Sequence, residues 1–499
     1  MATVAELVEA IHAAPRGPRV AACFDYDGTV IDGFSASAFY RHRIRGMDIG
    51  PVELARTLLA SARGIGGEQD FADFLELSLA AWKGETEEAV AELGEKLFRD
   101  EIAGRLHHET WRLAEAHHAM GHTIVLASSA TRFQIEPMAR ELGADHALCT
   151  PIEIRDGVVT GRTAGAPLWG DAKARAVRAL AAEHDLDLEA SFAYSNGDED
   201  VPFLEAVGNP VAVSPEGGLR AEAERRGWPV LRCDGRGATP GPRELARTAV
   251  FYGGMAAGMG AGLGVGLLRR SRQTLVDIAG EVGSDLGLAA AGIDVRVVAG
   301  TEHLWSARPC IFVFNHQSKL DPILLMKLLR GGFTGVAKKE AANVPGFGQF
   351  FRLAGVAFID RGDTTQAKRA LAPAVAKVRD EGLSLVLAPE GTRSPTPRLG
   401  RFKKGAFHIA MQAEVPMVPI VIRNAGEVMW RGAQTLHAGT VEVAALPPVD
   451  TSDWTVATID DHVAHVRAMF VDTLAAWPGD PQPPVPQRAP RRQPAKAAR

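Results

Sequence analysis

The chain has 499 residues, and this length predicts two or three domains. Apolar residues make up 46% and charged residues 23%, which excludes a disordered chain, a collagen-like repeat and a coiled coil. The four cysteines lie far apart without a CxxC pair. This spacing argues against a disulfide scaffold or a structural zinc site and fits a reducing compartment. Residues 1–240 carry a net charge of −14 and residues 241–499 one of +9, which add to −5, so the basic half suits a polyanionic partner such as nucleic acid, anionic lipid or coenzyme A.

The chain begins with apolar residues at helical spacing and has no basic stretch followed by an apolar core. This pattern predicts a helix rather than a signal peptide, so we expect the catalytic parts to stay on the cytoplasmic side. In both halves, short apolar runs then alternate with helical patterns, which is typical of an α/β architecture with parallel sheets. The predicted strands are 20–24, 123–127, 192–194 and 211–213 in the first half, and 310–314, 356–359, 383–387 and 418–422 in the second.

Reactive side chains follow the apolar runs of the first half, at the strand ends where ligand sites of α/β sheets lie. The first run leads into Asp25-Tyr26-Asp27-Gly28-Thr29, in which two carboxylates two residues apart point the same way. One can attack as a nucleophile while the other, kept protonated, donates a proton to the leaving group. Three further elements follow in order: Ser128, Lys173 within Gly-Asp-Ala-Lys, and the acidic segment Asn196-Gly197-Asp198-Glu199-Asp200.

Together these motifs resemble the haloacid dehalogenase superfamily, in its phosphoserine-phosphatase-like branch (subfamily IB), over residues 17–235. The resemblance implies a Rossmann-like domain at residues 1–235 with a helical cap at about 35–118. It implies a Mg²⁺-dependent phosphomonoesterase in which Asp25 accepts the phosphoryl group and Asp27 is the general acid and base. It also implies the binding residues: Thr29 and Ser128 for phosphate oxygens, Lys173 for charge neutralisation, and Asp25, the Asp27 carbonyl, Asn196 and Asp200 for the metal.

Two positions depart from the pattern of this superfamily. The last motif usually begins with Asp, whereas Asn196 stands here and supplies a neutral ligand that binds Mg²⁺ more weakly. Phosphoserine phosphatases carry a glutamate nine residues after the nucleophile, where this chain has Phe34. We therefore expect an apolar phosphomonoester as substrate rather than phosphoserine. The alternative is a catalytically inactive regulatory or binding module.

A Gly/Pro-rich stretch, CDGRGATPGPR at residues 233–243, separates the two halves because it continues neither a helix nor a strand. Residues 249–268 then form an uncharged apolar segment that ends beside Arg269, Arg270 and Arg272. Glycines recur in it at every fourth position, 254, 258, 262 and 266, which predicts a close-packing helix face. We interpret residues 236–285 as a linker with a membrane-associating segment, either spanning or peripheral; a glycine-rich soluble helix is the alternative.

The basic half contains a second group of motifs. The run 310–314 leads into Asn315-His316-Gln317-Ser318-Lys319-Leu320-Asp321-Pro322, in which Asp321 can orient the His316 imidazole while His316 takes a proton from an alcohol. Arg361 follows the run 356–359, and an arginine there suits phosphate. Pro389-Glu390-Gly391-Thr392-Arg393-Ser394 and the proline-bracketed segment 415–420 complete the set.

These four motifs, in this order, resemble the glycerolipid acyltransferase family that includes the lysophosphatidic acid (1-acylglycerol-3-phosphate) acyltransferases. The resemblance implies an α/β acyltransferase domain at residues 286–477. It implies His316 as general base with Asp321 as its partner. It also implies that the phosphoglycerol head of the acceptor is bound by a further set of residues, namely Arg361, Glu390, Gly391, Thr392 and Arg393.

The sequence therefore predicts a bifunctional, membrane-associated enzyme of phospholipid biosynthesis at the cytoplasmic face. We expect it to transfer a fatty acyl group from acyl-CoA or acyl carrier protein to 1-acylglycerol-3-phosphate, giving phosphatidic acid. Glycerol-3-phosphate or another lysophospholipid is the alternative acceptor. Few aromatic residues interleave with the basic ones, so we expect no nucleic-acid partner. Residues 478–499, rich in Pro, Gln and Arg, are predicted to form a disordered basic tail.

Overall fold

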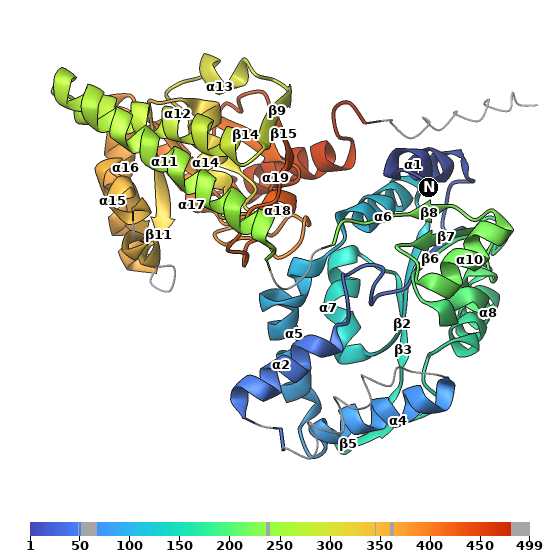
Figure 1. Ribbon diagram of the computed structural model, residues 1–499. Coiled ribbons are helices and arrows are strands. Elements are labelled where there is room, and N and C mark those ends of the chain that lie inside the picture. Colours follow the sequence, from blue (N-terminus) through green and yellow to red (C-terminus); the bar gives the residue numbers. More distant parts are fainter. Residues whose placement is uncertain (48, 51–66, 236–239, 345, 360–363, 481–499) are drawn as a thin grey trace, which may run out of the picture.

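The computed structural model describes residues 1–47, 49–50, 67–235, 240–344, 346–359 and 364–480. Figure 1 shows two lobes, one built from the blue and green first half of the chain and one from the yellow and red second half. Each lobe contains a mainly parallel sheet of six or seven strands flanked by helices. The predicted α/β fold class is confirmed.

The first sheet is parallel and has the strand order β3-β2-β1-β6-β7-β8. Alternate residues of β1 face opposite sides: Ala22 and Phe24 pack with α1, α6 and α7, while Ala21 and Cys23 pack with α8, α9 and α10. Burial on both faces explains why this strand reads as an uninterrupted apolar run. The strands are β1 (Ala21–Phe24), β2 (Thr123–Thr131), β3 (His146–Thr150), β6 (Phe192–Ser195), β7 (Asn209–Val213) and β8 (Val230–Leu231).

Helices cover both faces of this sheet. They are α1 (Val4–Ala13), α6 (His108–Met120), α7 (Arg132–Leu142), α8 (Asp171–His184), α9 (Val201–Leu204) and α10 (Gly217–Arg226). His117 lies in α6 and is buried, where its ring nitrogens bond the His122 ring and the Tyr194 hydroxyl. This histidine therefore has a structural place in the core.

The region inserted between β1 and β2 is mainly helical, as the sequence predicts. Its described helices are α2 (Ala36–Gly46), α4 (Glu68–Leu79), η1 (Ala80–Trp82), α5 (Glu87–Asp100) and η2 (Ile102–Arg105). α6, at the end of the predicted cap region, packs on α1 and β2 rather than on the cap helices. A hairpin that the sequence reading did not predict, β4 (Ile152–Arg155) with β5 (Val158–Thr163), packs on α4 and η1.

The second sheet has the strand order β12-β11-β13-β10-β14-β15-β9. Its neighbouring strands are parallel except β14 and β15, which are antiparallel. The strands are β9 (Ile293–Ala299), β10 (Ile311–Phe314), β11 (Phe333–Lys338), β12 (Ala357–Ile359), β13 (Ser384–Leu387), β14 (Met417–Ile422) and β15 (Gly439–Ala445). Around them lie α13 (His303–Ser306), α14 (Asp321–Leu329), η4 (Lys339–Asn343), α15 (Phe347–Leu353), α16 (Thr364–Glu381), α17 (Gly405–Ala413), α18 (Ala425–Val428) and α19 (Ile459–Ala475).

The glycine repeat lies on a helical hairpin formed by α11 (Pro242–Arg269) and α12 (Arg272–Ala290). A Cβ added to Gly258 would lie 2.2 Å from the Gly283 Cα, and one added to Gly254 would lie 2.5 Å from the Gly287 nitrogen. Only glycine permits this approach of the two backbones. α11 begins at Pro242, so the last two residues of the Gly/Pro-rich stretch 233–243 belong to the helix. Figure 1 shows the hairpin extending beyond the second sheet.

The two lobes contact each other through named side chains. The Trp430 ring packs against the core of the first lobe and lies against Gly104 of η2, where an added Cβ would be 2.7 Å from the ring. The Thr396 hydroxyl donates to the Glu141 carboxylate. His108 lies 3.8 Å from Glu427. The segments 393–398 and 424–431 of the second lobe therefore face η2, α6 and α7 of the first.

Candidate active sites

The first site lies where β1 and β6 end side by side, next to the part of β2 that extends beyond them. Asp25, directly after β1, is buried, and the Lys173 ammonium bridges its Oδ1 at 2.8 Å and the Asp200 Oδ2 at 2.6 Å. Ser195 also donates to Asp200 Oδ2, at 2.5 Å. Burial lowers the pKa of Lys173, but the carboxylates of Asp200 and Asp25 outweigh burial and raise it. A permanently charged lysine is thus fixed beside the Asp25 carboxylate.

The two carboxyl groups of the Asp25 segment differ in their hydrogen bonds. Asp27 accepts from the Ser35 backbone N–H at 2.7 Å and from the Ser35 hydroxyl at 3.1 Å, while Asp25 accepts from Lys173 and Thr29. Burial raises the pKa of Asp27 to about 7 and that of Asp25 to about 6. Burial thus favours the protonated form of Asp27, as a general acid requires, whereas at Asp25 the Lys173 charge is the main opponent of burial.

Oxygen atoms gather beside Asp25. The Thr29 hydroxyl lies 3.1 Å from both Asp25 Oδ2 and Asn196 Oδ1, and Asp200 Oδ1 is a buried oxygen without a hydrogen-bond partner among the described residues. Carboxylate and amide oxygens are the ligands that Mg²⁺ prefers, so the donor set fits this ion. Ser128, in β2 beyond its paired region with β1, is buried and accepts from the Ala130 N–H.

Two residues of the acidic segment, Asp198 and Glu199, were not assigned to the site from the sequence. Asp198 turns away from the site and accepts from the N–H groups of Gly218 and Leu219 at the start of α10. Burial, followed by the neighbouring Asp200 charge, raises the pKa of Glu199 to about 7, and its carboxylate lies over Gly197. Glu199 is therefore the second carboxylate of this segment that senses the Lys173 and Asp25 charges.

The second site lies where β10 ends. Asn315 holds this end by donating to the Ile422 carbonyl and accepting from the Ile422 N–H, both at 2.7 Å. His316 Nδ1 lies 2.6 Å from Asp321 Oδ2, and the backbone N–H groups of Gln317 and Ser318 donate to the same oxygen at 2.9 Å. Asp321 is fully buried at the first position of α14. The carboxylate thus fixes the imidazole and leaves Nε2 for an incoming hydroxyl.

Glu390 lies behind the histidine. Its Oε1 accepts from the His316 backbone N–H at 2.7 Å and its Oε2 from the Gly400 N–H at 2.8 Å. Burial raises the pKa of Glu390 to about 7. Both carboxylate oxygens of Glu390 therefore accept backbone hydrogen bonds, and one of these bonds positions His316. The sequence predicted instead that Glu390 contacts the acceptor.

The segment after Glu390 forms an open turn. Gly391 has a φ of +72°, and the Lys403 side chain lies over it, 3.1 Å from where a Cβ would be. Thr392 is exposed. Arg393 donates to the Arg431 carbonyl at 3.0 Å, and Arg431 donates back to the Arg393 carbonyl at 3.1 Å. Ser394 then donates its N–H to the His316 carbonyl, so the turn is tied to the histidine.

Two basic positions complete the account of this site. Arg361 lies outside the described residues, although β12, which precedes it, pairs with β11. Lys319, between His316 and Asp321, was not singled out from the sequence. Burial and the Arg393 charge lower its pKa, and its ammonium donates to the Ala433 carbonyl. Lys319 and Arg393 therefore lie close enough for the Arg393 charge to act on the Lys319 ammonium.

Comparison with known proteins finds a family for each half of the chain. Residues 22–205 match the haloacid dehalogenase-like hydrolase family, and residues 295–423 match the acyltransferase family. A 1-acyl-sn-glycerol-3-phosphate acyltransferase from Limnanthes douglasii is 35% identical over 205 residues, 41% of this chain and 72% of the relative. The chain belongs to the 1-acyl-sn-glycerol-3-phosphate acyltransferase family, and its first half is a haloacid dehalogenase-like hydrolase domain.

Other relatives resemble one half of the chain each. A protein from Streptomyces azureus named inhibition of morphological differentiation protein is 34% identical, over 48% of this chain and 92% of its own length. The crystal structure of a 1-acyl-sn-glycerophosphate acyltransferase from Thermotoga maritima is 27% identical over 47% of this chain and 97% of that chain, with a TM-score of 0.40. Asp25, Lys173 and Asp200 lie within the hydrolase match, and His316 and Arg393 lie within the acyltransferase match.

Proposed function

We propose that the second lobe transfers a fatty acyl group from a thioester to the free hydroxyl of 1-acylglycerol-3-phosphate, giving phosphatidic acid. The observation that carries this proposal is the bond of His316 Nδ1 to the buried Asp321 carboxylate. His316 Nε2 takes the proton of the acceptor hydroxyl as its oxygen attacks the thioester carbonyl, and the sulfur leaves as a thiol. Asp321 stabilises the imidazolium that forms. Acyl-CoA and acyl carrier protein are both donors that fit this chemistry.

The cations around the histidine support a phosphorylated acceptor. Lys319 feels the Arg393 charge, and the Ser394 N–H next to Arg393 donates to the His316 carbonyl. We place both cations, with Arg361, Gly391 and Thr392, at the phosphoglycerol head. Glycerol-3-phosphate and other lysophospholipids share this head group, so they are the competing acceptors.

The test is thioester-dependent acylation of these acceptors by the purified chain. His316→Ala should lower the rate by roughly 10²–10⁴-fold, the usual contribution of a general base. Asp321→Asn should be of similar severity because the amide stabilises the wrong tautomer. His303→Ala, a histidine outside the site, is the matched control and should retain activity. Full activity in folded His316→Ala would refute the assignment.

We infer that the first lobe is a phosphomonoesterase. The observation that carries this inference is Lys173 between Asp25 and Asp200, together with the unpartnered Asp200 oxygen. Asp25 attacks the phosphorus as the alcohol leaves with the proton of Asp27. Water, which gives a proton back to Asp27, then cleaves the phosphoaspartate to free phosphate and Asp25, while Lys173, Thr29 and Ser128 hold the phosphoryl oxygens. Mg²⁺, held by Asp25, the Asp27 carbonyl, Asn196 and Asp200, would reduce repulsion between the carboxylate and the phosphate.

An inactive module is the second candidate for this lobe, and Asn196 favours it because an amide brings no charge to the metal. The discriminating experiment is hydrolysis of a panel of phosphomonoesters, including lysophosphatidic and phosphatidic acid, at saturating Mg²⁺. Turnover that Asp25→Asn abolishes supports the phosphatase. No turnover by the parent or by Asn196→Asp supports the inactive module.

We further propose that the helical hairpin binds the membrane on the cytoplasmic side. α11 is long and apolar enough to cross a membrane, and only 22% of its most apolar part is buried. Leu267 and Leu268 are 73% and 86% exposed, beside Arg269 and Arg270. Apolar side chains next to arginines suit the surface of an anionic bilayer. Leu267→Ser with Leu268→Ser should reduce co-sedimentation with phosphatidic acid vesicles, and unchanged co-sedimentation would refute this role.

A further inference from the structure

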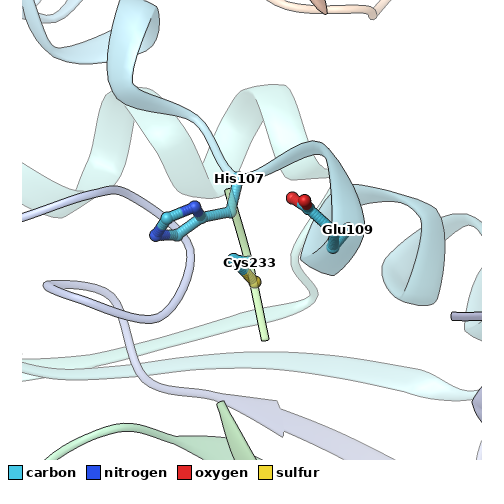
Figure 2. Close-up of side chains that lie close together, drawn as sticks. All are labelled: His107, Glu109 and Cys233. Carbon is cyan, nitrogen blue, oxygen red and sulfur yellow. The ribbon is translucent and has the colours of Figure 1, made fainter. Parts of the chain in front are cut away.

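Three metal-binding side chains meet on the first lobe, outside the site that contains Asp25. They are His107, Glu109 and Cys233, and one ligand atom from each lies within 4.8 Å of the other two (Figure 2). His107 is the residue before α6, Glu109 lies in the first turn of that helix, and Cys233 follows β8. More than 120 residues separate the cysteine from the other two in sequence, so the tertiary fold brings them together.

The backbone holds each of these residues in place. The His107 N–H donates to the Val30 carbonyl at 2.9 Å, and the Cys233 N–H donates to the Ser214 hydroxyl at 3.0 Å. Glu109 Oε1 accepts from the Asp234 N–H at 3.0 Å, which ties the carboxylate to the segment of the cysteine. These bonds fix the backbone of His107 and Cys233 and one carboxylate oxygen of Glu109.

Glu109 supplies the observation that points to a ligand. Its Oε2 is buried and has no hydrogen-bond partner among the described residues. A carboxylate oxygen removed from water costs free energy unless a donor or a cation compensates it. Figure 2 shows the carboxylate of Glu109 on one side of Cys233 and the His107 ring on the other.

We propose that His107, Glu109 and Cys233 bind a Zn²⁺ ion, with water in the fourth position. Imidazole nitrogen, thiolate sulfur and carboxylate oxygen are the three donor types that zinc takes in proteins, whereas Mg²⁺ avoids nitrogen and sulfur. Donors around tetrahedral zinc lie about 3.3–3.5 Å apart, so binding draws the three side chains together by about 1 Å. The sequence shows no CxxC pair for this site because its ligands come from two distant segments.

The position of the site gives the ion a structural consequence. His107 lies in the second of the two connections between the cap region and the sheet, and its N–H bonds the Val30 carbonyl of the first. Cys233 lies where the chain leaves the first sheet toward α11. Zinc would therefore fasten the cap connection to the end of the first lobe.

The experiment is titration of the metal-free full chain with Co²⁺ alone and then Zn²⁺ alone, in excess Mg²⁺ so that the oxygen-rich Asp25 site is saturated. We expect one equivalent to bind, with a near-ultraviolet sulfur-to-cobalt charge-transfer band that Zn²⁺ abolishes. Cys233→Ser should remove the band. Glu109→Gln should keep it but weaken binding by more than the roughly 10–100-fold that loss of an outer partner costs.

The matched control is Cys149→Ser, which changes a half-buried cysteine of the same lobe outside the cluster. It should bind like the parent. A band that persists in Cys233→Ser and disappears in Cys149→Ser would overturn the assignment, as would a parent that shows no thiolate band at all. If Cys233→Ser does not fold, normal affinity in the conservative Glu109→Gln would also overturn it.

Discussion

The proton balance between Asp25 and Asp27 determines when the hydrolase site can work. Burial raises the pKa of Asp25 to about 6 and that of Asp27 to about 7. Protonation of Asp25 removes its nucleophilicity, and Mg²⁺ bound to Asp25 would move this acidic decline below the pKa that burial alone gives. Above about pH 7 Asp27 loses the proton that the leaving alcohol needs, so we expect kcat/KM for an alkyl phosphate to decline there, as a pH profile measures.

A leaving group that needs no proton provides the control for this profile. With p-nitrophenyl phosphate the alkaline decline should shrink, because p-nitrophenolate leaves without help from Asp27. The acidic decline should remain, since Asp25 attacks in both reactions. Equal alkaline declines with the two substrates would contradict the role of Asp27.

Asn196 lies at the proposed Mg²⁺ position of the same site. Its amide oxygen accepts from Thr29 beside Asp25, while Asp198 is held by the start of α10. Asp198 therefore stabilises the start of a helix and does not replace the charge that Asn196 lacks. We expect Asn196→Asp to lower the Mg²⁺ concentration for half-maximal hydrolysis by roughly 10-fold through its added charge. The measurement is the rate against Mg²⁺ concentration. An unchanged requirement would indicate that Glu199 already supplies the missing charge.

At the scale of elements, burial explains what the sequence could and could not predict. β1, β6 and β10 are buried along their whole length, so their apolar runs were recognisable. β4 and β5 are partly exposed and carry Glu153, Arg155 and Arg162, so no apolar run marks them. Alternating polar and apolar residues in so short a hairpin resemble an ordinary loop.

At the sites, distance along the chain separates the predictable contacts from the others. His316 with Asp321 was predictable because the two residues are close in sequence and lie at a strand end. The backbone bonds of Glu390 and the placement of Glu199 depend on tertiary packing, which no local pattern records. The cluster of His107 and Cys233 was missed for the same reason.

The packing of α11 on α12 makes a sharp prediction for two glycines of one helix. A Cβ at Gly258 would lie 2.2 Å from the Gly283 Cα, whereas one at Gly260 meets nothing within 4 Å. Gly258→Ala should destabilise the hairpin by about 1–3 kcal/mol, since the backbones must separate. Gly260→Ala should stabilise the helix by about 0.5–1 kcal/mol. Hydrogen exchange of both helices measures the difference, and equal protection in the two variants would refute the close packing.

At the scale of the whole molecule, Trp430 connects the two lobes. Its ring lies against Gly104 of η2, and its indole N–H donates to the Pro395 carbonyl at 2.9 Å, beyond the turn that carries Arg393. On the other side, Arg105 donates to the Phe34 carbonyl and the Ser37 hydroxyl of the cap region. The indole therefore contacts both the Pro395 segment of one lobe and the cap connection of the other.

Two substitutions of Trp430 separate these contacts. Trp430→Ala removes the ring and the N–H, so hydrogen exchange should rise both in residues 102–106 and in residues 393–396. Trp430→Phe keeps a ring against Gly104 but loses the bond to Pro395, worth about 1 kcal/mol, so exchange should rise in 393–396 alone. If Trp430→Ala leaves residues 102–106 as protected as in the parent, the ring does not couple the lobes. If both segments respond to Trp430→Ala, acylation and phosphate hydrolysis should also fall together in that variant. The reason is that residues 393–396 and the cap connection lose the same contact, the Trp430 indole.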